Sequence, residues 1–77
     1  MEVIVYMTPT CIWCKKLEEF LKKKKIKFDR RDVTEESVYR DELLEKSAQL
    51  AVPVIDIDGK IIIGFEEKQI EEALAKK

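Results

Sequence analysis

The sequence contains no histidine and no asparagine, and it has only two residues each of cysteine, proline and glycine. The absence of histidine excludes imidazole bases, triads built on them and most catalytic zinc sites. No apolar run approaches the roughly 18 residues of a membrane-spanning helix. The acidic start also lacks the basic-then-apolar layout of a signal peptide. We therefore expect a cytoplasmic protein that makes no contact with a membrane.

An excess of charge of one sign is also missing, because 15 basic residues balance 16 acidic ones to a formal net charge of -1. Nucleic-acid-binding proteins need an uncompensated basic face, so this balance argues against a nucleic-acid partner. A chain of 77 residues with 45% hydrophobic content holds one modest core, which predicts a single domain over residues 1–77. Abundant Lys and Glu without Asn is the composition typical of a thermophile.

Apolar patterns predict four strands and three helices in the order β-α-β-α-β-β-α. The predicted strands cover residues 3–7, 26–33, 54–57 and 61–63, and the helices cover 12–24, 35–50 and 66–76. Because a helix joins the first two strands, these strands should be parallel. The Asp58-Gly59 turn should join the last two strands as an antiparallel hairpin. Helices on both faces would then give an α/β three-layer sandwich around a four-stranded mixed sheet.

Side chains at helical spacing predict which face of each helix is buried. Thr10 and Thr34 are the predicted N-caps of the first two helices, and Glu35 and Glu36 should lie in the first turn of the second. The apolar stripe of the first helix consists of Trp13, Leu17, Phe20 and Leu21, and the predicted inward residues of the other two helices are Tyr39, Leu43, Leu44 and Leu50, then Ile70, Ala73 and Leu74.

Cys11 and Cys14 lie where the first strand passes into the first helix. A helix N-terminus offers unpaired N–H groups and the positive end of the dipole, and both favour a thiolate. We therefore predict that Cys11 is an exposed nucleophile and that Cys14, one turn further on, can reach it. Cys11 would attack a substrate disulfide, and Cys14 would then attack Cys11 and release the reduced substrate. A C-x-x-C pair near a βαβ pattern indicates this redox chemistry.

Two other interpretations of the cysteine pair stay open at this point. A zinc or iron–sulfur site would need ligands from a second protomer, because the chain supplies neither another cysteine pair nor histidine. Inert structural thiols are the third interpretation. Trp13 is open as well, because it heads an apolar stripe but also directly precedes Cys14. We interpret it as a partly exposed residue at the rim of the site that stacks on the incoming chain.

The stretch from Thr8 to Cys14, the Val52-Pro53 pair and Gly64 resemble the glutaredoxin family in order and spacing, over essentially the whole chain. This resemblance implies a thioredoxin-like fold, a nucleophilic Cys11, a resolving Cys14, a cis peptide bond before Pro53 and a backbone at Val52 that pairs with the bound thiol peptide. From the residues and the resemblance together, we predict that substrate is bound by Thr10, Ile12, Trp13, Ala51, Val52, Pro53, Gly64, Phe65 and Glu66.

The chain departs from the common glutaredoxin pattern at several of these positions. Thr8 stands where many members have a Lys that meets a glutathione carboxylate, Ile12 replaces a frequent Pro, and Ala51 replaces a Thr. Phe65 and Glu66, followed by another Glu, replace a small, glycine-containing segment that holds the γ-glutamyl end of glutathione. Carboxylates there should repel glutathione, although they also suit the first turn of a helix.

The Gly-Phe pair instead resembles the glutaredoxin-like redoxins that serve ribonucleotide reductase and are reduced by thioredoxin reductase. It is also similar to small glutaredoxin-like proteins of anaerobes and archaea. We therefore predict a monomeric dithiol-disulfide oxidoreductase, without a bound cofactor or metal, that reduces protein disulfides and donates electrons to a reductive enzyme. Glutathione or an NADPH-dependent thioredoxin reductase would supply the electrons. A glutathione-dependent glutaredoxin is the alternative, and a metal or iron–sulfur binding module is a third.

Overall fold

The computed structural model describes residues 2–75 and contains the seven elements in the predicted order. These are β1 (Val3–Met7), α1 (Ile12–Lys23), β2 (Asp29–Asp32), α2 (Ser37–Ser47), β3 (Val54–Ile57), β4 (Lys60–Ile63) and α3 (Glu67–Ala75). The strands form one sheet in the order β2-β1-β3-β4. The β1–β2 pair is parallel, and the β1–β3 and β3–β4 pairs are antiparallel. The predicted mixed sheet is confirmed.

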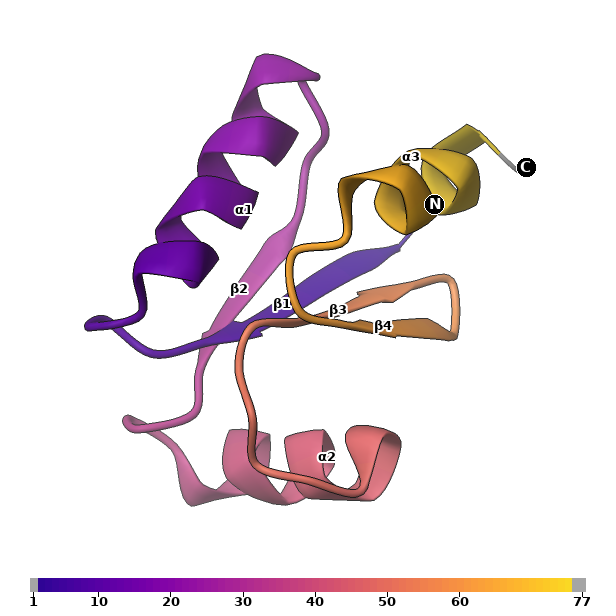
Figure 1. Ribbon diagram of the computed structural model, residues 1–77. Helices are drawn as coiled ribbons and strands as arrows, with labels where there is room; N and C mark the ends of the chain where they lie inside the picture. The colour runs from indigo at the N-terminus through magenta and orange to yellow at the C-terminus, as the bar shows by residue number, and fades with distance from the viewer. Residues whose placement is uncertain (1, 76–77) are drawn as a thin grey trace.

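Helices cover both faces of this sheet, with α1 and α3 on one side and α2 on the other (Figure 1). β1 is buried at all five positions, because it is a central strand covered on both faces. Val3, Val5 and Met7 belong to the larger core cluster with α1 and α3, whereas Ile4 and Tyr6 pack with Leu43 of α2. This alternation confirms the three-layer α/β sandwich. Within residues 2–75, no helix is long and apolar enough to span a bilayer.

The second helix is shorter than the sequence pattern predicts. Its first residue is Ser37, and Thr34 does not cap it, because the N–H and hydroxyl of Thr34 both donate to Asp32 Oδ1 and close a turn after β2. Glu35 and Glu36 therefore precede the helix instead of lying in its first turn. The side chain of Asp32 bonds both groups of Thr34 in a local turn, and this turn replaces the start of a helix. The prediction that Thr34 is the N-cap was wrong for this reason.

Two leucines predicted to face inward are instead about half exposed. Leu44 is 48% exposed and Leu50 is 47% exposed, while Leu43 is fully buried and Tyr39 is half-buried. The cause for Leu50 is the end of α2, where Ala48 adopts the left-handed conformation with φ 62° and the chain leaves the helix. The α2 face is therefore partly apolar at its surface.

The predicted strand over residues 26–33 and the predicted helix over residues 66–76 also change their bounds. Only Asp29–Asp32 pairs with β1, whereas Ile26 and Phe28 pack on the core without joining the sheet. α3 begins at Glu67, and the predicted last helical residue, Lys76, lies outside the described residues. A short, charged β2 suits its position at the edge of the sheet, where it limits unwanted strand pairing.

A network of polar side chains ties α2 to the sheet. The Tyr6 hydroxyl donates to Glu42 Oε1 at 2.9 Å and accepts from Lys46 Nζ at 2.9 Å. Arg31 pairs with Glu42 at 2.5 Å, and Lys46 pairs with Asp56 at 2.7 Å. Within residues 2–75, every buried side-chain nitrogen or oxygen has a hydrogen-bond partner. The network therefore fixes α2 without leaving a buried polar group unpaired.

We expect the stability of the protein to fall at acid pH in part through Glu42. Burial alone would raise the pKa of Glu42, but the hydrogen bond from Tyr6 and the pairing with Arg31 hold it below the usual 4.5. A carboxyl with a depressed folded-state pKa stabilises the fold above its unfolded-state value and loses that contribution as pH falls through the folded-state value. Urea unfolding of Glu42→Gln should therefore depend less on pH below about 4.5 than wild type does. Glu45→Gln, an exposed change on the same helix, should keep the wild-type dependence, and an unchanged profile for Glu42→Gln would refute the role of this residue.

Candidate active site

The first cysteine is itself the N-cap of α1. β1 ends at Met7, and the N–H of Cys11 donates to the carbonyl of Thr8 at 3.3 Å, which turns the chain towards the helix. The Sγ of Cys11 then accepts the N–H of Cys14 at 3.1 Å. The predicted cap, Thr10, is exposed and is not the N-cap. A sulfur acceptor one residue later occupies the capping position, so Cys11 Sγ receives a backbone N–H of the first helical turn.

The two thiols differ sharply in accessibility. Cys11 is half-buried at the surface, and Cys14 is fully buried in the α1 and α3 core cluster. Burial, followed by the hydrogen bond with Cys11, raises the pKa of Cys14 to about 12. A thiol that keeps its proton is a poor nucleophile. In the reduced protein, Cys11 is therefore the thiol that an external disulfide can meet.

Trp13 and Ile12 form an exposed apolar rim between the cysteines. Trp13 is 55% exposed, and Ile12 is also exposed, because the buried stripe of α1 consists of Cys14, Leu17 and Leu21. Trp13 therefore lies outside the buried stripe, and its exposure agrees with a position at the rim, whereas its stacking on an incoming chain stays a prediction. Lys16 Nζ lies 4.6 Å from the centroid of the Trp13 ring, one turn along the helix. This cation–π contact places a positive charge on the Trp13 side of the site.

Further predicted site residues lie in the segments before β3 and after β4. The Val52-Pro53 peptide bond is cis, as the family resemblance implies. The N–H of Gly64 donates to the carbonyl of Pro53 at 2.8 Å and joins the two segments. Gly64 has φ 83°, a left-handed conformation that favours glycine. Phe65 then turns inward and meets Phe20 edge-on, with ring centroids 5.5 Å apart.

Residues from these segments and from α1 line an open cavity of about 330 Å³. The lining residues are Trp13, Val52, Pro53, Gly64, Phe65 and Glu66. The structure thus brings together six of the nine residues predicted to bind substrate. The other three, Thr10, Ile12 and Ala51, are exposed and do not line this cavity. The cavity is open, mostly apolar and adjacent to the helix that begins at Cys11, so it can receive a side chain next to a reacting disulfide.

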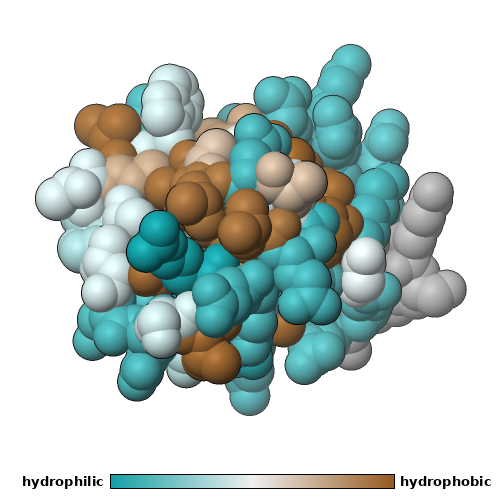
Figure 2. Space-filling view, turned by 90° about the horizontal axis from the view of Figure 1, so that it is seen from below, coloured by the Kyte–Doolittle hydropathy of each residue, from teal (hydrophilic) through white to brown (hydrophobic). Residues whose placement is uncertain are grey.

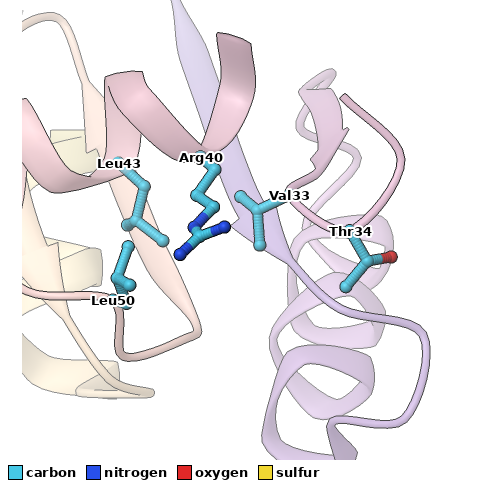
Figure 3. Close-up of a pocket in the computed structure, with 5 residues that line it drawn as sticks. All are labelled: Val33, Thr34, Arg40, Leu43 and Leu50. Carbon is cyan, nitrogen blue, oxygen red and sulfur yellow. The ribbon is translucent and has the colours of Figure 1, made fainter. Parts of the chain in front are cut away.

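A second cavity, of about 360 Å³, lies on the α2 side and was not predicted. Val33, Thr34, Arg40, Leu43 and Leu50 line it, and Figure 3 shows the Arg40 side chain between the two leucines and Val33. Val33 follows β2 and donates its N–H to the carbonyl of Met7, the last residue of β1. The cavity therefore lies near the end of β1 at which the turn towards Cys11 begins. The sequence pattern predicted that Leu50 lies on the inward face of the second helix, and the cavity was therefore missed.

The surface around this second cavity is partly apolar. Val38, Leu44 and Leu50 are exposed, and Figure 2, which views the molecule from the α2 side, shows apolar side chains gathered among hydrophilic ones. Neither cavity is lined by a cysteine, but the first includes Trp13, which lies between Cys11 and Cys14 in the chain, whereas no residue of α1 lines the second.

A metal ion would find few ligands on this chain. Among residues 2–75, no group of three or more Cys, Asp and Glu side chains lies close enough to hold one. A site built on Cys11 and Cys14 would therefore need further ligands from elsewhere.

The thioredoxin-like sandwich, with a thiol pair at the start of α1, is the architecture of a thiol-disulfide oxidoreductase. The model of the glutaredoxin family matches residues 3–62. A glutaredoxin-like 8.6 kDa protein in a rubredoxin operon of Clostridium pasteurianum, described as uncharacterized, is 46% identical over 72 residues, or 94% of this chain and 96% of that protein. The chain therefore belongs to the glutaredoxin family.

Solved structures of family members have the same fold. Glutaredoxin from Archaeoglobus fulgidus has a TM-score of 0.88 at 25% identity, covering 96% of this chain and 86% of that one. Methanosarcina acetivorans methanoredoxin has a TM-score of 0.88 at 30% identity, covering 96% of this chain and 84% of that one. The predicted thioredoxin-like fold and thiol-disulfide oxidoreductase class are confirmed.

Proposed function

We propose that this protein reduces disulfide bonds of partner proteins, with Cys11 as the attacking thiol and Cys14 as the resolving thiol, and that it passes electrons to a reductive enzyme. The observation that carries this proposal is the asymmetry of the pair. Cys11 is accessible at the N-cap of α1, whereas Cys14 is buried one turn along and keeps its proton. A reducing cytoplasm would keep both groups as thiols between reactions.

In the first step, Cys11 Sγ attacks one sulfur of the substrate disulfide. A bond forms between Cys11 and that sulfur, the substrate S–S bond breaks, and the second substrate sulfur leaves as a thiolate that takes up a proton. The N–H of Cys14 donates to Cys11 Sγ at 3.1 Å and holds that atom at the start of α1.

In the second step, Cys14 loses its proton and attacks Cys11 Sγ. The mixed disulfide breaks, the first substrate sulfur leaves as a thiol, and an intramolecular Cys11–Cys14 disulfide forms. Two electrons have then moved from the protein dithiol to the substrate disulfide. The dithiol itself stores them, so the cycle needs no bound cofactor, but it does need a reductant that restores the two thiols.

We favour an NADPH-dependent thioredoxin reductase as that reductant, with glutathione as the alternative. Phe65 is held against Phe20 and lines the cavity in which a small thiol would dock. Glu66 lines the same cavity, and its carboxylate is exposed. Like charges at close range oppose the docking of glutathione, which carries two carboxylates.

A paired assay tests the electron source. We expect NADPH oxidation with thioredoxin reductase and a protein disulfide to be at least about 10-fold faster than with glutathione and glutathione reductase. The reason is that repulsion between Glu66 and the carboxylates of glutathione weakens glutathione binding by about that factor. Glu66→Gln should narrow the difference by improving the glutathione rate, whereas Glu72→Gln, on the exposed surface of α3, should not. Equal or faster turnover with glutathione in the wild-type protein would overturn this part of the proposal.

A further inference from the structure

The cavity beside the cysteines contains an acidic group that the redox mechanism does not use. Glu66 lines the cavity together with Trp13, and its side chain is exposed. None of the ion pairs found within residues 2–75 includes Glu66. Within residues 2–75, the carboxylate therefore borders the cavity without an ion-pair partner.

The backbone under Glu66 is held in place while its side chain stays available. The carbonyl of Glu66 accepts the N–H of Ile70 at 2.9 Å, which anchors the residue at the start of α3. The neighbouring Phe65 ring is fixed by Phe20, and Gly64 is bonded to Pro53. The carboxylate is thus presented from a rigid wall.

Two aromatic rings line the same cavity. Trp13 contributes an exposed indole, and Phe65 contributes a half-buried ring. Aromatic faces accept the methylene stem of a long basic side chain, and they attract its cation. Lys16 lies over the Trp13 ring, so an incoming cation is repelled from that side and attracted towards Glu66.

We propose that this cavity binds an arginine or lysine side chain of the protein segment whose disulfide Cys11 attacks. The stem would lie between the apolar walls, and the cationic head would pair with Glu66. This inference rests on the proposed function and specifies its substrate class, a disulfide flanked by basic residues. An acidic segment would meet the uncompensated carboxylate and be disfavoured. Glu66 also lies where a helix dipole favours an anion, a role that requires no ligand and would give no preference among substrates.

Three cysteine peptides of one length test this inference, with arginine, glutamine or glutamate on both sides of the cysteine. Each is supplied as a mixed disulfide with thionitrobenzoate. Cys11 Sγ attacks the peptide sulfur, the mixed disulfide breaks, and the coloured thionitrobenzoate anion leaves. Rates with the fully reduced protein are divided by rates with dithiothreitol, which corrects for the intrinsic reactivity of each peptide.

We expect the wild-type protein to react about 3- to 5-fold faster with the arginine peptide than with the glutamine peptide at low ionic strength, the size of an exposed ion pair. The glutamate peptide should react slowest. Salt at about 0.5 M should reduce the differences between the three rates, because it screens the charges. Glu66→Gln should abolish the preference, and Glu66→Lys should reverse it. Glu72→Gln, a matched change on the exposed surface of α3, should preserve it.

Equal normalised rates for the three peptides, or a preference that survives Glu66→Gln, would overturn the inference while leaving the redox function intact. A failure of the function looks different. In that case the wild-type protein would release thionitrobenzoate from every peptide no faster than Cys11→Ser does.

Discussion

Replacing Cys14 with serine is expected to turn the protein into a covalent trap for its substrates. Attack by the accessible Cys11 survives the change, but no second thiol remains to break the mixed disulfide. Turnover of protein disulfides without glutathione should fall by more than about 100-fold, because resolution is lost as a step. Non-reducing electrophoresis and mass spectrometry should show adducts on Cys11 that dithiothreitol removes.

The matched control is Cys11→Ser, which keeps the buried thiol and removes the accessible one. It should form no adducts, because Cys14 is fully buried and holds its proton. Adducts that accumulate in Cys11→Ser and not in Cys14→Ser would show that the roles of the two thiols are reversed. Adducts in neither variant would contradict disulfide exchange at this site.

Iodoacetamide is expected to modify Cys11 and to leave Cys14 unmodified in the folded, reduced protein at neutral pH. Burial raises the pKa of Cys14 to about 12, and its side chain is shielded from solvent. A thiol with such a pKa is ionised to only about one part in 10⁵ at neutral pH. Peptide mass spectrometry should therefore give a rate ratio above about 10³ in favour of Cys11.

Unfolding provides the control for this selectivity. In urea, both cysteines should react at similar rates, because burial is the main cause of the raised pKa of Cys14. Comparable labelling of the two thiols in the folded protein would contradict the buried, protonated state of Cys14.

The same raised pKa links Cys14 to stability at alkaline pH. The folded state holds a proton that the unfolded state releases near 9, so the contribution is complete below that value and is lost as pH rises towards about 12. Between pH 9 and about pH 12, the free energy of unfolding of Cys14→Ser should therefore fall less than that of the wild-type protein.

The fold followed from local patterns to a large extent. The continuous apolar run from Val3 to Met7 identified the central strand, since only a strand covered on both faces buries every position. The Asp58-Gly59 turn identified the hairpin of β3 and β4. The pattern failed at the ends of α2, because hydrogen bonds of Asp32 with Thr34 and the left-handed Ala48 compete with helix propagation. Periodicity does not register such local alternatives.

The candidate site divides in a similar way. The sequence by itself determined the two thiols, their placement at a strand-to-helix junction and the thiol-disulfide chemistry that follows, because these depend on residues close together in the chain. Only the tertiary structure decided that Cys11 caps the helix, that Trp13 is exposed while Cys14 is buried, and that Phe65 and Glu66 line one cavity with Trp13. These features depend on contacts between residues far apart in the chain, such as Phe20 with Phe65, and on burial in the shared core. The spacing of residues along the chain does not predict such contacts, because they form only when the helices pack against the sheet.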